Sequence, residues 1–193
     1  MSFLNISNTI DIIFGPMFSG KTSELIHKLN IFAVAGYKVL YVNSDLDNRD
    51  SEEVFSTHNP SLKKMNENIK QVKTKKLMTL LDISTYDIIG IDEAQFFDDL
   101  IDFCLMSCDV LKKKIIVAGL SGDFNRQPFG QIIDLIPYCD NITKLYPFCV
   151  SCRDKEGRFM AASFSKRLSQ EKEKIVIGKE DKYIPVCREC YLE

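Results

Sequence analysis

Residues 12–29 read IIFGPMFSGKTSELIHKL, and this stretch decides the fold. Its centre matches the pattern G-x-x-x-x-G-K-[ST], directly after an apolar run and directly before a helical pattern. In such a loop, backbone N–H groups at the start of the helix cradle phosphates. The lysine reaches the outer phosphates, and the hydroxyl that follows it binds Mg²⁺. We therefore predict a nucleotide site in which Thr22 is a magnesium ligand. The residues of this site are Gly15, Pro16, Met17, Phe18, Ser19, Gly20, Lys21 and Thr22.

Short apolar runs alternate with helical patterns around and beyond this loop. The expected strands are 10–14, 38–43, 87–91, 115–119 and 142–145, and the expected helices are 23–35, 76–83, 98–111 and 130–136. This alternation is typical of an α/β fold in which a parallel sheet carries helices on both faces. The segment 47–76 is polar and rich in lysine and asparagine, so we expect it to contain a flexible loop.

Composition changes after Tyr146, where cysteines and a charged stretch replace the strand–helix pattern. We therefore predict two domains, a nucleotide-binding domain at 1–146 and a smaller domain at 147–193.

The net charge of the chain limits the classes of partner that it can attract. The chain has 193 residues and a net charge of −2, which gives no general electrostatic attraction to nucleic acid or an anionic membrane. No apolar run approaches the ~18 residues of a membrane-spanning helix. The N-terminus lacks the basic and long apolar regions of a secretory signal. We expect a cytoplasmic protein that contacts neither nucleic acid nor membrane.

The stretch YDIIGIDEAQFF, residues 86–97, carries a second signal. An apolar strand that ends in Asp92 supplies a carboxylate, which can hold Mg²⁺ directly or through water. As an isolated dipeptide, Asp92 and Glu93 could equally form a solvated turn. Beside a phosphate loop, we interpret Asp92 as the metal-side carboxylate and Glu93 as the base that takes a proton from a phosphoryl acceptor.

Four of the seven cysteines occur in two C-x₂-C pairs, CVSC at 149–152 and CREC at 187–190. The odd total argues against a fully paired disulfide framework. Two such knuckles are typical of a structural, tetrahedral Zn²⁺ site, so the predicted zinc ligands are Cys149, Cys152, Cys187 and Cys190. Redox-active pairs are the alternative, although such a pair normally lies near a βαβ unit rather than twice in a terminal module.

Several segments together resemble the zinc-containing thymidine kinase family, of the human cytosolic and poxviral type. In chain order they are GPMFSGKT, THN at 57–59, IDEAQFF, PFG at 128–130, SFSKRL, VIGKEDKY and VCREC. The resemblance covers residues 10–191. It implies a kinase that transfers the γ-phosphate of ATP to the 5′-hydroxyl of thymidine, with deoxyuridine as a second candidate acceptor. It also implies Mg²⁺, a structural Zn²⁺ and a homotetramer.

The resemblance further implies roles for individual residues. Glu93 matches the catalytic base of the family, and the residues that join the phosphate loop on the ATP side are Asp47, Arg49, Asp92 and Gln95. The implied thymidine pocket consists of Met17, Phe96, Leu120, Phe124, Phe129, Ser165, Val176, Ile177, Gly178 and Tyr183. The last four belong to a lasso loop between the cysteine pairs, which would close over the base and sugar.

Some positions depart from the family pattern. Ser121 stands where Asp is common, Lys179 replaces a common Gly, and the insert RDKEGRFMA follows Cys152. We expect this insert to be a solvated excursion. Arg49 also lies about one residue further from Phe55 than is usual in the family.

Two other function classes fit parts of the sequence. One is another P-loop nucleotide hydrolase with a structural zinc ribbon, but no N-K-x-D base-reading motif follows a strand. The other is a zinc-ribbon nucleic-acid adaptor. The acidic charge balance speaks against it, and salt-dependent retention on DNA would test it.

Overall fold

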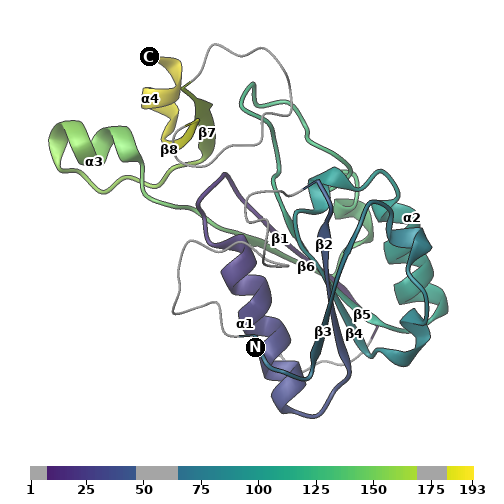
Figure 1. The fold of residues 1–193 in the computed structure, drawn as a ribbon. Coiled ribbons are helices and arrows are strands. Elements are labelled where there is room, and N and C mark those ends of the chain that lie inside the picture. The colour runs from purple at the N-terminus through teal and green to yellow at the C-terminus, as the bar shows by residue number, and fades with distance from the viewer. Residues whose placement is uncertain (1–7, 47–64, 169–181) are drawn as a thin grey trace.

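A six-stranded, fully parallel sheet forms the centre of the computed structural model, with the strand order β3-β2-β4-β5-β1-β6 (Figure 1). The structure describes residues 8–46, 65–168 and 182–193. Its parallel strands are β1 (Ile10–Phe14), β2 (Val39–Ser44), β3 (Ile69–Thr74), β4 (Ile88–Ile91), β5 (Lys114–Gly119) and β6 (Asn141–Lys144). The predicted α/β class is confirmed.

Helices and short helical turns connect these strands. The α-helices are α1 (Lys21–Val34), α2 (Leu100–Leu105), α3 (Val150–Glu156) and α4 (Arg188–Leu192). A π-helical turn, η5 (Met106–Val110), continues α2. The 3₁₀ turns are η2 (Leu77–Thr79), η3 (Ile83–Thr85), η4 (Ala94–Phe96) and η6 (Ile136–Tyr138).

Successive residues of a strand pack into different layers of the core, because side chains alternate across a sheet. Ile13 of β1 packs in a cluster with Leu25 and Leu29 of α1. Its neighbour Ile12 packs in a second cluster with Phe103 of α2. Figure 1 shows α1 and α2 on opposite sides of the sheet. The near-continuous apolar strands in the sequence follow from this burial on both faces.

Some elements differ from the sequence expectation. The segment 47–76, expected to contain a flexible loop, also includes the edge strand β3, which was not predicted and whose side chains are mostly half-buried. An edge strand need not be apolar. The sequence IKQVKT has no apolar run, so it did not indicate a strand. The helical pattern at 76–83 forms two separate 3₁₀ turns, since Asp82 adopts a φ of 56° that interrupts a helix. The pattern at 130–136 likewise forms turns that lead into η6.

The C-terminal module comprises α3, α4 and an antiparallel pair of strands, β7 (Phe164–Arg167) and β8 (Tyr183–Val186). It lies beyond the end of the sheet at which β1 passes into α1 (Figure 1). The insert after Cys152 begins with Arg153, Asp154 and Lys155, which are exposed, as a solvated excursion requires, and belong to α3. Within the described ranges, every helix is too short or too polar to traverse a bilayer.

Candidate active site

The phosphate loop joins β1 to α1 and turns sharply into the helix. Gly20, the N-cap residue, has a φ of 81°, a left-handed conformation that glycine adopts most readily. Among the described residues no side chain caps this helix, an arrangement that suits an anion at its N-terminus. Lys21 is buried, and its ammonium donates a hydrogen bond to the Pro16 carbonyl oxygen over 2.7 Å.

Ser19 supports the same interpretation of the loop. Its hydroxyl oxygen is buried and has no hydrogen-bond partner among the described residues. A buried polar group left unpaired costs about 1–3 kcal/mol. A phosphate oxygen held by the loop would accept a hydrogen bond from this hydroxyl, so the residues present fit a bound nucleoside triphosphate.

Asp92 follows β4 and is buried at the same end of the sheet. Its oxygens accept hydrogen bonds from the Tyr41 hydroxyl at 2.8 Å and from the Glu93 backbone N–H at 2.9 Å. Its side chain is also hydrogen-bonded to that of Thr22. The structure therefore brings Thr22 and Asp92, the two predicted magnesium ligands, into contact.

Burial dominates the electrostatics of Asp92. Desolvation, and secondly the charge of Glu93, raise the pKa of the Asp92 carboxyl from 3.8 to about 6, although hydrogen bonds from Tyr41 and Thr22 oppose the shift. A divalent cation beside the carboxylate would favour its ionised form. Oxygen ligands of this kind suit Mg²⁺.

We expect Asp92→Asn to stabilise the protein when magnesium and nucleotide are absent. Since the folded-state pKa is raised from 3.8 to about 6, the folded chain binds the Asp92 proton more tightly than the unfolded chain. The stability that this proton confers is lost as the pH rises through about 6. Asparagine avoids this loss. At about 1.4 kcal/mol for each pKa unit, its advantage should reach roughly 2–3 kcal/mol near pH 7.5.

Urea unfolding at about pH 5 and about pH 7.5 measures this effect. The buffer should lack magnesium but contain no chelator, so that any thiolate-bound metal stays in place. The gain from Asp92→Asn should be larger at the higher pH. Asp98→Asn, at an exposed carboxylate, is the matched control and should show little gain at either pH. An equal gain from Asp92→Asn at both pH values would contradict the prediction.

Glu93, the predicted base, has a backbone φ of 49° and is 7% exposed. A left-handed conformation is uncommon for a residue with a side chain, and such residues cluster at functional sites. The Gln95 amide donates to Glu93 Oε2 at 2.5 Å and accepts from the Leu120 backbone N–H at 2.9 Å. Gln95, predicted for the ATP side, thus contacts the predicted base and the loop after β5.

The aromatic residues predicted for the nucleoside pocket form two groups. Phe96 and Phe129 meet edge to face, with ring centroids 5.7 Å apart. The guanidinium carbon of Arg167 lies 3.7 Å from the centroid of the Phe124 ring. Arg167 also donates from Nε to the Tyr183 hydroxyl over 3.1 Å. These groups combine apolar walls with a few polar atoms, as small-molecule sites commonly do.

Ser165 and Met17, also predicted for the pocket, join the C-terminal module to the phosphate loop. The buried Ser165 hydroxyl accepts a hydrogen bond from the Met17 backbone N–H over 2.9 Å. The position of β7 is therefore tied to the loop that would hold phosphates. The remaining predicted site residues, which lie outside the described part of the chain, are Asp47, Arg49, Val176, Ile177 and Gly178.

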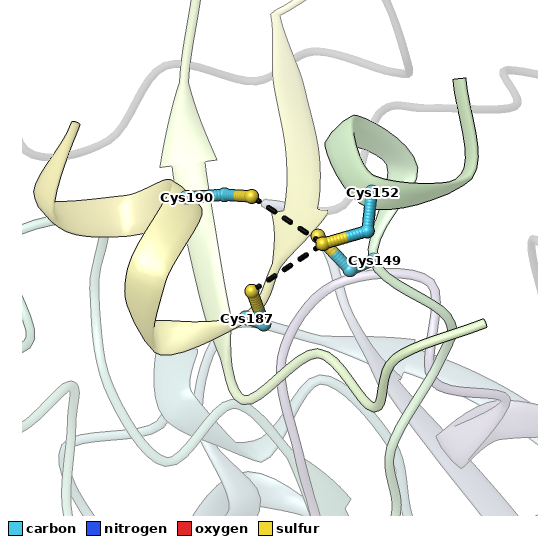
Figure 2. A group of neighbouring side chains, drawn as sticks. All are labelled: Cys149, Cys152, Cys187 and Cys190. Carbon is cyan, nitrogen blue, oxygen red and sulfur yellow. Dashed lines mark hydrogen bonds between the residues drawn. The ribbon is translucent and has the colours of Figure 1, made fainter. Parts of the chain in front are cut away.

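The four cysteines predicted to bind zinc converge between α3 and α4 (Figure 2). Their Sγ atoms all lie within 4.8 Å of one another, and all four residues are buried. Cys152 Sγ is 3.7 Å from Cys187 Sγ and 3.5 Å from Cys190 Sγ. A tetrahedron with Zn–S bonds of about 2.3 Å has edges of about 3.8 Å. These distances fit a zinc site, whereas a disulfide needs about 2.0 Å.

Local hydrogen bonds also favour a thiolate at Cys149. Burial raises the pKa of this thiol, but the backbone and side-chain hydrogen bonds of Cys152 and Cys187 together outweigh burial and lower the pKa to about 7. The thiolate is the form that binds metal. A site closed by four thiolates has no open position for a substrate, so its role would be structural.

Comparison with known proteins identifies the family. The family model for thymidine kinase matches residues 8–191. The chain belongs to the thymidine kinase family. Thymidine kinases from vaccinia virus (strain Western Reserve), monkeypox virus and variola virus are each 40% identical to it over 185 residues. Each alignment covers 95% of this chain and 97% of the viral relative.

A solved structure supports the fold alone. The flagellar accessory protein FlaH from Methanocaldococcus jannaschii matches with a TM-score of 0.50 and 16% identity. The match covers 74% of this chain and 72% of FlaH. It agrees with the parallel sheet described above.

Three residues that connect the parts of this thymidine kinase-family site were not predicted from the sequence. Tyr41 donates a hydrogen bond to Asp92, and the available signal was a tyrosine within the otherwise aliphatic run VLYV. Arg167 stood in the recognised segment SFSKRL but was given no role. The Tyr191 hydroxyl donates to the Phe124 carbonyl oxygen over 2.7 Å. These two residues are 67 positions apart, so no local pattern could have indicated the contact.

Proposed function

We propose that this chain is an ATP:thymidine 5′-phosphotransferase, which converts thymidine and ATP to dTMP and ADP. The observation that carries the proposal is the convergence of Thr22, Asp92 and Glu93 in a member of the thymidine kinase family. Thr22, at the start of α1, is hydrogen-bonded to Asp92, and Glu93 follows Asp92 after the end of β4. The carboxyl ends of parallel strands are where α/β folds bind ligands. A phosphate loop and a carboxylate pair are the parts that phosphoryl transfer requires.

On the donor side, residues 15–22 bind the ATP phosphates. Lys21 would exchange its contact with the Pro16 carbonyl for the outer phosphate oxygens, where its charge stabilises the transferring group. Thr22 and Asp92 would hold Mg²⁺, which would supply positive charge to the phosphates. Asp47 and Arg49, predicted for the ATP side, complete this part of the proposed site, whereas Gln95 contacts Glu93 and the Leu120 backbone.

On the acceptor side, Glu93 takes the proton of the thymidine 5′-hydroxyl as that oxygen attacks the γ-phosphorus. A positioned carboxylate can serve as this base near neutral pH. The pyrimidine lies against the apolar and aromatic side chains of the predicted pocket, and the lasso at 176–183 closes over it. Exclusion of water from this space favours transfer to thymidine over hydrolysis of ATP.

The decisive test is ADP formation from ATP with each of the four deoxynucleosides, with deoxyuridine, and without any nucleoside. We expect thymidine to accelerate ADP release far above the rate without nucleoside, with dTMP formed in equal amount. Deoxyuridine tests the possible second substrate. Equal ADP release in every sample would instead favour the alternative, a P-loop hydrolase with a structural zinc ribbon.

We also propose the finer features that the sequence and the family resemblance indicate. These are a zinc-stabilised C-terminal domain at 147–193 beside the nucleotide-binding domain at 1–146, a homotetramer, and a cytoplasmic location without contact to nucleic acid or membrane. The buried cluster of four thiols supports the zinc. Metal analysis and light scattering of the purified protein would test the zinc and the tetramer.

A further inference from the structure

Gln95 lies between the proposed base and the loop that follows β5, and its side chain is 3% exposed. Its Oε1 accepts the Leu120 backbone N–H at 2.9 Å, and its Nε2 donates to Glu93 Oε2 at 2.5 Å. A backbone N–H can only donate, so the Leu120 contact fixes which end of the amide is the oxygen. The amino end is then directed at the Glu93 carboxylate.

Two glycines leave space for Gln95. A Cβ on Gly119 would lie 2.6 Å from Gln95 Oε1, and a Cβ on Gly130 would lie 2.3 Å from the Gln95 carbonyl oxygen. Real Cβ atoms essentially never approach so closely. A side chain at either position would therefore displace the residue that contacts Glu93. The close packing restricts Gln95 along its backbone and at its amide.

We propose that Gln95 is a positioning residue that holds one oxygen of Glu93, so that the other oxygen is presented to the acceptor hydroxyl. This inference rests on the proposed role of Glu93 as the base. A carboxylate has two oxygens, and a bond to one of them restricts the rotation of the other. Glu93 stands in a left-handed turn outside a regular helix or strand, and the hydrogen bond from Gln95 limits the rotation of its carboxylate. Gln95 supplies the restriction and takes no proton.

Two substitutions separate positioning from packing. Gln95→Met keeps the length of the side chain but removes both hydrogen bonds. Gln95→Glu keeps an oxygen for the Leu120 N–H but replaces the amino donor with an oxygen that repels the Glu93 carboxylate, or shares a proton with it. We expect both variants to lower kcat by about 10- to 100-fold, because small misplacements of reacting groups have effects of this size. The KM values for thymidine and ATP should change by less than about threefold, since substrate binding is not what Gln95 provides.

Gln131→Met is the matched control. Gln131 also binds a backbone N–H through its amide oxygen, accepting from Ile101 at 3.0 Å, but it makes this contact at the start of α2. It should keep the kcat of the unmodified protein. Wild-type kcat in Gln95→Glu would show that the Leu120 contact and packing suffice, and would overturn the proposal. A rise in KM without a fall in kcat would overturn it as well.

A double variant ties the effect to Glu93. In a Glu93→Gln background, Gln95→Met should cause little further loss, because the group that Gln95 positions is already gone. An undiminished further loss would show that Gln95 acts elsewhere and would overturn the proposal. If Glu93→Gln alone retained turnover, the proposed base itself would be wrong. If Glu93→Gln lost turnover while Gln95→Met kept it, only the positioning role would fail.

Discussion

Replacement of Glu93 by glutamine should lower kcat by about 10²–10⁴, the range that general base catalysis contributes. Gln has nearly the shape of Glu, and its carbonyl oxygen can still accept the hydrogen bond that Gln95 donates. What the substitution removes is the ability to take a proton from the acceptor hydroxyl. Single-turnover measurements with saturating ATP and thymidine isolate this chemical step from product release.

Two controls accompany this measurement. Asp98→Asn removes a carboxylate that is exposed and only five positions along the chain, and it should leave kcat unchanged. Binding of ATP to Glu93→Gln should stay close to that of the unmodified protein, because the phosphate loop is intact. Near-full turnover by Glu93→Gln would contradict the role and would require another group to accept the proton.

The donor side of the site could be predicted from sequence because its chemistry is local. The residues from Ile10 to Val34 form the strand, phosphate loop and helix in one continuous stretch. Steric requirements fix Gly20 at the turn, and phosphate chemistry fixes Lys21 and Thr22 beside it. Asp92 was predictable for a related reason, since it ends an apolar strand of the same sheet.

The connections between these parts could not be predicted, because they join residues far apart in the sequence. Tyr41 reaches Asp92 across 51 positions, and Gln95 reaches Leu120 across 25. The contact between Met17 and Ser165 spans 148 positions. Each depends on strand order and side-chain direction, which no pattern of residue types specifies. The polar edge strand β3 was missed for a different reason, since its pairing with β2 rather than its composition makes it a strand.

The hydrogen bond between Ser165 and the Met17 backbone changes the expected effect of zinc on the proposed site. In a chain with separate donor and acceptor parts, a C-terminal zinc site would affect the nucleoside alone. Here β7 carries Ser165 against the phosphate loop and Arg167 against Phe124. The α4 helix carries Tyr191, which also binds Phe124. The module that zinc would stabilise therefore contacts both sides of the proposed site, with more of its contacts on the nucleoside side.

Cys149→Ser should reduce the zinc content from about one ion per chain to near zero, since each of four thiolates is required for a closed site. Structural zinc contributes about 10 kcal/mol or more to the folding of small metal-binding modules. Its loss should therefore release the β7–β8 pair, which ends at Val186 directly before Cys187. We expect the KM for thymidine to rise by about 10- to 200-fold, the range for lost contacts in an apolar pocket.

The rise in the KM for ATP should be smaller but measurable, because Ser165 would no longer accept the Met17 N–H. Cys139→Ser is the matched control. Cys139 lies outside the cluster and donates to the Ile136 carbonyl oxygen over 3.1 Å, a bond that a serine hydroxyl can replace. This variant should keep both its zinc, measured by plasma emission spectrometry, and its KM values. Full zinc content in Cys149→Ser, or a Cys149–Cys152 disulfide in place of metal, would refute the zinc assignment. Zinc loss without any change in the KM for thymidine would instead show that the module does not shape the nucleoside pocket.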